Sequence, residues 1–181
     1  MRISSLLGKK VLITGEAGSG KSTRLLELLK DAINMELVGH ITIIDMAPKR
    51  AGWFGGKLKE LDPSVNELRY LTSEDILGPR LSGRSAEEVA AIAKRNAGLI
   101  EPLLMAYLKA PTPLLFVNDV TIYLHTGDLE LLKSAIAASQ TFVGTAYEGV
   151  KLSEDRGSGL TKIERERLEI LKSWVDAVIA L

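Results

Sequence analysis

The chain has 181 residues, 46% of them hydrophobic, and this length and composition suit a single domain spanning residues 1–181 with a buried core. Lysine and arginine together number 23, as do aspartate and glutamate, so the formal net charge is zero, which argues against a broad basic surface for nucleic acid. The absence of cysteine excludes disulfides, a cysteine nucleophile and a cysteine-type zinc site, and two histidines are too few for a histidine-rich metal site.

No window approaches eighteen uncharged apolar residues, and the first eight residues lack a long apolar core. We therefore expect a cytoplasmic protein with neither a signal peptide nor a membrane span. The sequence leaves open whether the chain forms a homo-oligomer and which second substrate or protein partner it has.

The first distinctive segment begins with a nearly all-apolar strand predicted at 10–14, a composition typical of a strand covered on both faces. It is followed by G-E-A-G-S-G-K-S-T, residues 15–23, and then by an amphipathic helix predicted from Lys21 to about Ala32. A strand, the pattern G-x-x-x-x-G-K-S and a helix, in this order, indicate a P-loop, or Walker A element. The alternative is a glycine-rich turn with a surface lysine.

The chemistry of a P-loop follows from its residue types. Glycines let the backbone curl so that consecutive N–H groups point inward, and the helix N-terminus behind them favours an anion. Lys21 is expected to reach the β- and γ-phosphates of a nucleotide, and the Ser22 hydroxyl to be a Mg²⁺ ligand. The expected nucleotide contacts are Gly15, Glu16, Ala17, Gly18, Ser19, Gly20, Lys21, Ser22 and Thr23.

A second strand is predicted at 40–45 and ends in Asp45. Because ligands of open α/β sheets bind outside the carboxyl ends of strands, Asp45 is a candidate contact for ligand, water or Mg²⁺, the alternative being an Asx-type turn. The loop at 46–57 places Trp53 and Phe54 among glycines and basic residues, which favours either a platform for a flat ligand or a tryptophan packed as a lid on the core.

A third strand is predicted at 67–71, followed by a glycine-containing loop that carries Arg80 and Arg84. Such arginines can act on developing phosphate charge as an arginine finger does, or they can simply be solvated. The pattern S-A-E-E from Ser85 to Glu88 predicts a capped helix that extends to about residue 110 and is kinked by Pro102.

The next predicted strand, 113–118, is followed by Asp119. An apolar run ending in an acid is the Walker B pattern, so Asp119 is predicted as the carboxylate on the Mg²⁺ side of the site. Asn118 lies where many such enzymes carry another acid. His125 follows in a loop, where a lone histidine is more often structural than catalytic.

The remaining chain predicts a helix opening at Gly127-Asp128, a strand at 141–145, and a polar segment at 146–159 that carries Arg156. A capping-box pattern at 161–164 predicts a final helix that continues through Val178. The alternating charges of 164–169 indicate a solvated face.

The alternation of strands and helices, with the P-loop on the first strand, resembles P-loop NTPases of the RecA-like type over most of the chain. This resemblance implies a three-layer α/β fold with a central, mostly parallel sheet of about five strands and helices on both faces. Strand order, which separates RecA-like sheets from kinase-like ones, is left open.

Residues 41–56, 114–132 and 141–149 are also similar to segments of the ATP:corrinoid adenosyltransferases. That family's loop is typically G-x-G-K-G-K-T-T and its Walker B strand ends in D-E, whereas this chain has G-E-A-G-S-G-K-S and Asn118-Asp119. The resemblance implies that ATP donates its adenosyl group and that Trp53 and Phe54 lie near the corrin.

Three functions follow from these motifs. The first is a Mg·ATP-dependent ATPase in which Lys21 and Asp119 are catalytic, Ser22 and Asp119 hold the metal, and Glu16 or Asp45 orients the attacking water. The second is an ATP-dependent transferase, either a corrinoid adenosyltransferase or a small-molecule kinase. The third is a non-catalytic nucleotide-binding or assembly module in which Asn118 replaces a catalytic acid. The choice between ATP and GTP is open.

Overall fold

The structure is a computed structural model that describes residues 1–50 and 56–181. Its centre is one six-stranded sheet in which all neighbouring strands are parallel, in the order β3-β2-β4-β5-β1-β6. The strands are β1 (Lys10–Gly15), β2 (Ile41–Asp45), β3 (Arg69–Thr72), β4 (Leu114–Asn118), β5 (Thr141–Tyr147) and β6 (Ala177–Ala180).

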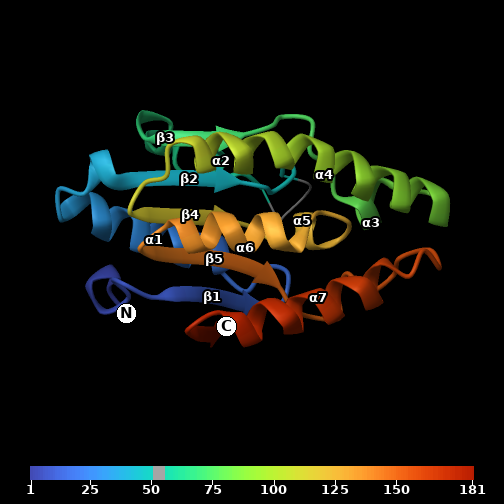
Figure 1. Ribbon diagram of the computed structural model, residues 1–181. Coiled ribbons are helices and arrows are strands. Elements are labelled where there is room, and N and C mark those ends of the chain that lie inside the picture. Colours follow the sequence, from blue (N-terminus) through green and yellow to red (C-terminus); the bar gives the residue numbers. More distant parts are fainter. Residues whose placement is uncertain (51–55) are drawn as a thin grey trace.

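Helices cover both faces of the sheet, as Figure 1 shows. The α-helices are α1 (Lys21–Asn34), α2 (Leu58–Leu61), α3 (Pro79–Ser82), α4 (Ala86–Lys109), α5 (Thr121–Leu124), α6 (Leu129–Ala138) and α7 (Leu160–Trp174). Short 3₁₀ turns lie at Ile3–Ser5, Val38–His40 and Pro63–Glu67.

The two core layers follow from the alternation of side chains along the strands. In β1, Leu12 faces a core formed with α4, α6 and α7, whereas Val11 and Ile13 face a second core formed with α1 and α2. Both sets are fully buried, which is why β1 has an almost continuous apolar sequence. The predicted three-layer α/β fold is confirmed, with six strands instead of about five.

The strand order places β5 between the P-loop strand β1 and the strand β4 that ends at Asn118. An inserted strand at this point is the arrangement of RecA-like sheets, whereas kinase-like sheets pair the two strands directly. Because all strands are parallel, their carboxyl ends meet at one edge of the sheet, where Gly15, Asp45, Asn118 and Tyr147 end their strands.

The C-terminal prediction was wrong in three respects. The last helix ends at Trp174, and residues 177–180 form the edge strand β6 beside β1. The predicted capping box is not formed, because Gly159 (φ +76°) is the N-cap and the Asp155 carboxylate accepts from the Thr161 N–H at 2.9 Å. Glu164 is buried, not solvated.

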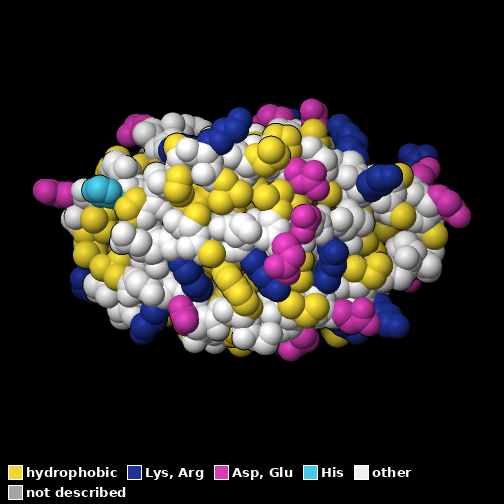
Figure 2. Space-filling model, in the orientation of Figure 1, with side chains coloured by type: hydrophobic (Ala, Val, Ile, Leu, Met, Phe, Trp, Pro, Cys, Tyr) yellow, Lys and Arg dark blue, Asp and Glu magenta, His cyan; other side chains and the backbone are white. Residues whose placement is uncertain are grey.

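The long helix α4 has the predicted start and the predicted length. The Ser85 hydroxyl accepts from the Glu88 N–H at 3.2 Å, and the helix continues past Pro102 to Lys109. On the face seen in Figure 2, acidic and basic side chains are interspersed, as the balanced composition predicts. Among the helices of the described residues, none has the length and apolar character needed to cross a bilayer.

Candidate nucleotide-binding site

The P-loop backbone has the conformation that its glycines allow. Gly15, Gly18 and Gly20 have φ angles of +154°, +80° and +91°, which residues with a side chain rarely adopt. A Cβ on Gly15 would lie 2.6 Å from the backbone oxygen of Leu181 and 2.7 Å from Ser19 Oγ. Gly20 is the N-cap of α1 and supplies no capping side chain, so the amides at the start of this 14-residue helix remain available to an anion.

The Lys21 ammonium lies back on its own loop. Its Nζ donates to the carbonyl oxygens of Gly15 at 2.8 Å and Glu16 at 2.6 Å. Burial lowers the pKa of Lys21, and the charges of Asp119 and Glu16 act in the opposite direction. When a phosphate binds, the Lys21 ammonium would exchange these two neutral carbonyl acceptors for a charged phosphate oxygen.

A cavity of about 270 Å³ opens over the P-loop. It is lined by loop residues 17–18 and 20–23, by Asn118 and Asp119 after β4, and by Tyr147 at the end of β5. The structure therefore brings Lys21, Ser22 and Asp119 together around one cavity, whereas Asp45 is not among its lining residues.

Asp119 follows β4 in the left-handed conformation, with φ +58°. Its carboxylate accepts from the Thr121 hydroxyl, and its N–H donates to Thr145 Oγ1 at 2.8 Å. Burial raises the pKa of Asp119, although the charges of Lys21 and His125 oppose this rise. A strained acid with a raised pKa at a cavity wall is a pattern found at catalytic sites.

The residue that contacts Ser22 is Asn118. Ser22 Oγ donates to Asn118 Oδ1 at 3.1 Å, and Asn118 Nδ2 donates to Asp45 Oδ1 at 3.0 Å. Asp45 is fully buried and also accepts from the N–H groups of Ala47 and Leu58. The bond from the Ala47 N–H is the Asx-type turn that was the alternative to a ligand contact for Asp45. Asp45 is connected to the cavity through its hydrogen bond with Asn118.

Glu16 joins the P-loop to the segment after β5. Its carboxylate accepts from the N–H groups of Ala17 and Val150, each at 2.8 Å, and of Lys151 at 3.1 Å. A Cβ on Gly149 would lie 2.4 Å from this carboxylate, so a side chain at residue 149 would displace the Glu16 carboxylate from its present position. Despite an opposing effect of burial, the backbone donors hold the pKa of Glu16 at about 2.

This depressed pKa predicts a pH-dependent effect of Glu16→Gln on stability. A carboxylate whose pKa is lowered on folding stabilises the fold above its unfolded value of about 4.3 and loses that effect as the pH falls towards 2. The variant should therefore have a lower urea midpoint than the wild type at pH 7, and the gap should narrow by pH 3.5. A difference in urea midpoint that stays constant with pH would contradict a stabilising role for the Glu16 charge.

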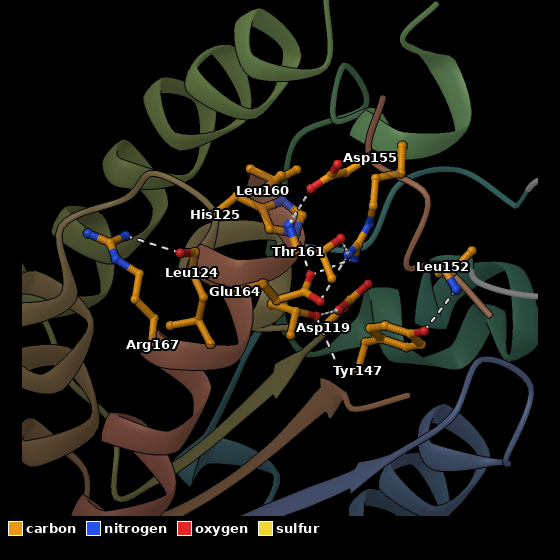
Figure 3. Close-up of polar contacts among 12 residues, drawn as sticks. Asp119, Leu124, His125, Tyr147, Leu152, Asp155, Leu160, Thr161, Glu164 and Arg167 are labelled. Carbon is orange, nitrogen blue, oxygen red and sulfur yellow. Dashed lines mark hydrogen bonds and ion pairs between the residues drawn. The ribbon is translucent and has the colours of Figure 1, made fainter. Parts of the chain in front are cut away.

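A buried polar cluster, formed by Arg80, His125 and Glu164, lies beside this cavity. Glu164 Oε2 is 2.6 Å from both Arg80 Nη2 and His125 Nε2, and Oε1 accepts from Arg80 Nη1 at 3.1 Å. Figure 3 shows Glu164 beside Asp119, and the charges of both Glu164 and His125 act on the Asp119 carboxyl group. The Arg80 guanidinium lies 5.4 Å from the Tyr147 ring centroid, so the cluster supports a wall of the phosphate cavity.

The basic residues singled out in the sequence differ in exposure and in partners. The Arg80 side chain is 7% exposed, whereas Arg84 and Arg156 are exposed residues. Lys57 is also buried, and its Nζ donates to the Ala47 carbonyl and to Thr72 Oγ1. The predicted aromatic platform, Trp53 and Phe54, lies outside the described residues.

Sequence reasoning missed Glu164, although its spacing carried a signal. Leu160, Glu164, Leu168 and Leu171 are the buried residues of α7 and follow one helical stripe. A charge on an apolar stripe requires a buried partner, and Arg80 and His125 provide it.

No family model matches the chain, and no curated protein matches it. Among solved structures, the chain is similar to the Pif1 helicase from Candida albicans, at 16% identity and a TM-score of 0.41, over 96% of this chain and 36% of that one. The chain thus spans about a third of the helicase's length. The site is therefore interpreted from its own geometry: a glycine loop, a helix N-terminus, a lysine and an acid around one cavity.

Proposed function

We propose that the chain binds ATP with Mg²⁺ and hydrolyses it. The observation that carries the proposal is the meeting of Lys21, Ser22 and Asp119 around one cavity at the uncapped N-terminus of α1. The site supplies loop N–H groups and an ammonium for phosphate, an oxygen ligand for a hard cation and a carboxylate for a proton.

The residues present fit a magnesium ion. Ser22 uses its hydroxyl proton towards Asn118 Oδ1, so the lone pairs of Oγ remain available to a cation. Oxygen is the ligand atom that Mg²⁺ prefers, and the ion usually keeps several waters beside one or two protein ligands. A magnesium ion bound by Ser22 would supply positive charge that offsets the negative charge of the phosphates.

The chain's own groups then account for hydrolysis. The loop N–H groups and Lys21 hold the phosphates in line, and Asp119 accepts a proton from the attacking water. The new bond joins the water oxygen to the γ-phosphorus, the bond to the β–γ bridging oxygen breaks, and ADP leaves. Because Thr121 engages Asp119 Oδ1, the second carboxylate oxygen is the one assigned to the proton. A raised pKa makes this carboxylate a stronger base than an ordinary aspartate.

The test is ATP binding and phosphate release by the wild type and by Lys21→Ala. Loss of a hydrogen bond to a charged group costs about 1.5–3 kcal/mol, so ATP affinity should fall roughly 10- to 150-fold. Phosphate release should fall to background. Lys162→Ala, at a lysine whose side chain is 82% exposed, is the matched control and should behave as the wild type. Equal affinity of Lys21→Ala and wild type would refute the proposal.

A second candidate is transfer of the γ-phosphoryl group to a small acceptor. A cavity of about 70 Å³, lined by Arg80, Ile122 and His125 among others, shares Asp119 and Leu152 with the phosphate cavity. Asp119 would then take its proton from an acceptor hydroxyl. This volume suits a small acceptor and not a corrin ring.

Product analysis separates these functions. ADP with free phosphate indicates the ATPase, ADP with a phosphorylated acceptor indicates the kinase, and tripolyphosphate indicates adenosyl transfer. Wild-type protein that binds ATP and forms none of these products would support the non-catalytic module.

A further inference from the structure

Asn118 has all its polar positions engaged. Its Oδ1 accepts from Ser22 Oγ at 3.1 Å and from Thr145 Oγ1 at 3.2 Å. Its Nδ2 donates to Asp45 Oδ1 at 3.0 Å and to the Gly56 carbonyl at 3.3 Å. The side chain is 1% exposed, so water does not substitute for these partners.

The neighbours fix which way the amide points. The Gly56 carbonyl can only accept, so it requires a donor from residue 118. Asp45 accepts from three groups besides Asn118: the N–H of Leu58 at 2.6 Å, the Tyr70 hydroxyl at 2.6 Å and the N–H of Ala47 at 3.1 Å. A carboxyl group that accepts four bonds has the hydrogen-bonding pattern of an ionised carboxylate.

A carboxylate at residue 118 would therefore meet two acceptors. It would lie about 3 Å from a second buried carboxylate and from a carbonyl oxygen, with no proton between them. The register of the sheet makes this contact unavoidable, because Asp45 and Asn118 are paired residues of the adjacent parallel strands β2 and β4. The amide of Asn118 therefore supplies the donor that the Asp45 carboxylate needs. The negative charge belongs to β2, whereas the residue that contacts Ser22 belongs to β4.

The charge of Asp45 has its own compensation. Lys57 is fully buried, and its ammonium is bonded to the Ala47 carbonyl and to Thr72 Oγ1. Thr72 Oγ1 in turn donates to the Asp45 carbonyl at 2.8 Å. This network holds the backbone of Asp45. Burial raises the pKa of the Asp45 carboxyl group, and the hydrogen bonds from Tyr70, Leu58 and Asn118 together with the charge of Lys57 act in the opposite direction and favour the ionised form.

We infer that Asp45 is a positioning residue of the nucleotide site, acting through the amide of Asn118 on Ser22. A carboxylate bonded to Nδ2 polarises the amide and strengthens Oδ1 as an acceptor for the Ser22 hydroxyl proton. Ser22 Oγ then presents its lone pairs to the cation. In P-loop NTPases a Walker B aspartate helps hold the metal. Here the negative charge is on Asp45 at the end of β2, and the amide of Asn118 at the end of β4 connects it to Ser22. The inference rests on the proposed binding of Mg·ATP.

A charge swap tests the relay. ATP dissociation constants are measured with Mg²⁺ and with EDTA for the wild type, Asp45→Asn, Asn118→Asp and the double variant, together with thermal midpoints of the nucleotide-free proteins. Asp45→Asn should reduce the Mg²⁺-dependent gain in affinity at least tenfold while changing affinity in EDTA less than threefold. Asn118→Asp should lower the thermal midpoint, because it opposes two buried carboxylates.

In the double variant the amide at residue 45 donates to the carboxylate at residue 118. The pair again has one donor and one carboxylate, and the negative charge now lies beside Ser22. Its thermal midpoint should exceed that of Asn118→Asp, and its Mg²⁺-dependent gain should return to within threefold of the wild type. Tyr70→Phe is the matched control, because it removes a bond to Asp45 on the side away from Asn118, so it should lower stability and leave the gain unchanged.

The outcomes separate this inference from the proposed function. Wild-type protein that does not bind ATP contradicts the proposed function. Wild-type binding with a Mg²⁺-dependent gain that is unchanged in Asp45→Asn, or a double variant no better than Asp45→Asn, overturns the relay alone. Where Asp45→Asn does not fold, the double variant decides: a folded protein with a wild-type gain supports the relay, and one without it refutes the relay.

Discussion

Replacing Glu164 with alanine is expected to lower the free energy of unfolding by about 3–5 kcal/mol, the cost of breaking a buried ion pair by removing one partner. The Glu164 side chain is 3% exposed, and those of Arg80 and His125 are 7% and 1% exposed. In the variant, the Arg80 guanidinium loses its bidentate carboxylate partner and stays in a low-dielectric site. Urea unfolding at pH 7 measures the difference.

Glu166 offers a matched control on the same helix. Its side chain is 63% exposed and its carboxylate lies 3.9 Å from Lys162 Nζ, so Glu166→Ala should cost less than about 1 kcal/mol. Glu164→Gln should fall between the two, because it keeps the shape and loses the charge. A cost below about 1 kcal/mol for Glu164→Ala would show that Arg80 finds another partner or reaches water.

The same cluster explains why part of the site escapes sequence reasoning. The three residues of the cluster lie far apart along the chain, and each has a commoner solvated or structural interpretation when taken alone. Their meeting depends on α3 and α7 lying beside the C-terminal end of α5, which no local pattern specifies. The helical stripe of α7 marks Glu164 as buried but does not name its partner.

The P-loop is different, because its information is local. A strand, a glycine loop and a helix follow one another within residues 10–34, and the positive φ angles of Gly18 and Gly20 are conformations that glycine adopts readily. For the same reason the capped start of α4 was predicted correctly. The edge strand β6 was missed because Val175 and Val178 also fit a helical period, and only pairing with β1 decides the matter.

Strand order decides the rest of the site. The sequence places Asp45 and Asn118 each at the end of a strand, but only the pairing of β2 with β4 brings their side chains into contact. The assignment of Mg²⁺ to Asp119 stays a prediction, while the contact with Ser22 belongs to Asn118. One residue of difference matters because Asn118 is the last residue of β4, paired with Asp45, whereas Asp119 lies beyond the strand in the left-handed conformation. Asn118 can therefore accept the hydrogen bond from Ser22, while Asp119 can accept a proton from the attacking water.

This division of roles predicts that Asp119→Asn reduces the rate of ATP hydrolysis by about 10²- to 10⁴-fold, the usual contribution of a positioned general base. ATP affinity should change only a few-fold, because the phosphates are held by the loop and Lys21. Single-turnover phosphate release with saturating protein measures the chemical step. Asp75→Asn, at an exposed aspartate before α3, is the control and should hydrolyse ATP as the wild type does.

The pH dependence distinguishes a base from a charge that only stabilises the fold. Hydrolysis needs the Asp119 carboxylate deprotonated, so the wild-type rate should rise with pH through an apparent pKa above the ordinary aspartate value of about 3.9. That acidic limb should disappear in Asp119→Asn, because the amide does not titrate. A variant that loses ATP affinity and hydrolysis in equal proportion, or that keeps the limb, would move the proton acceptor elsewhere and leave Asp119 a structural role at the cavity wall.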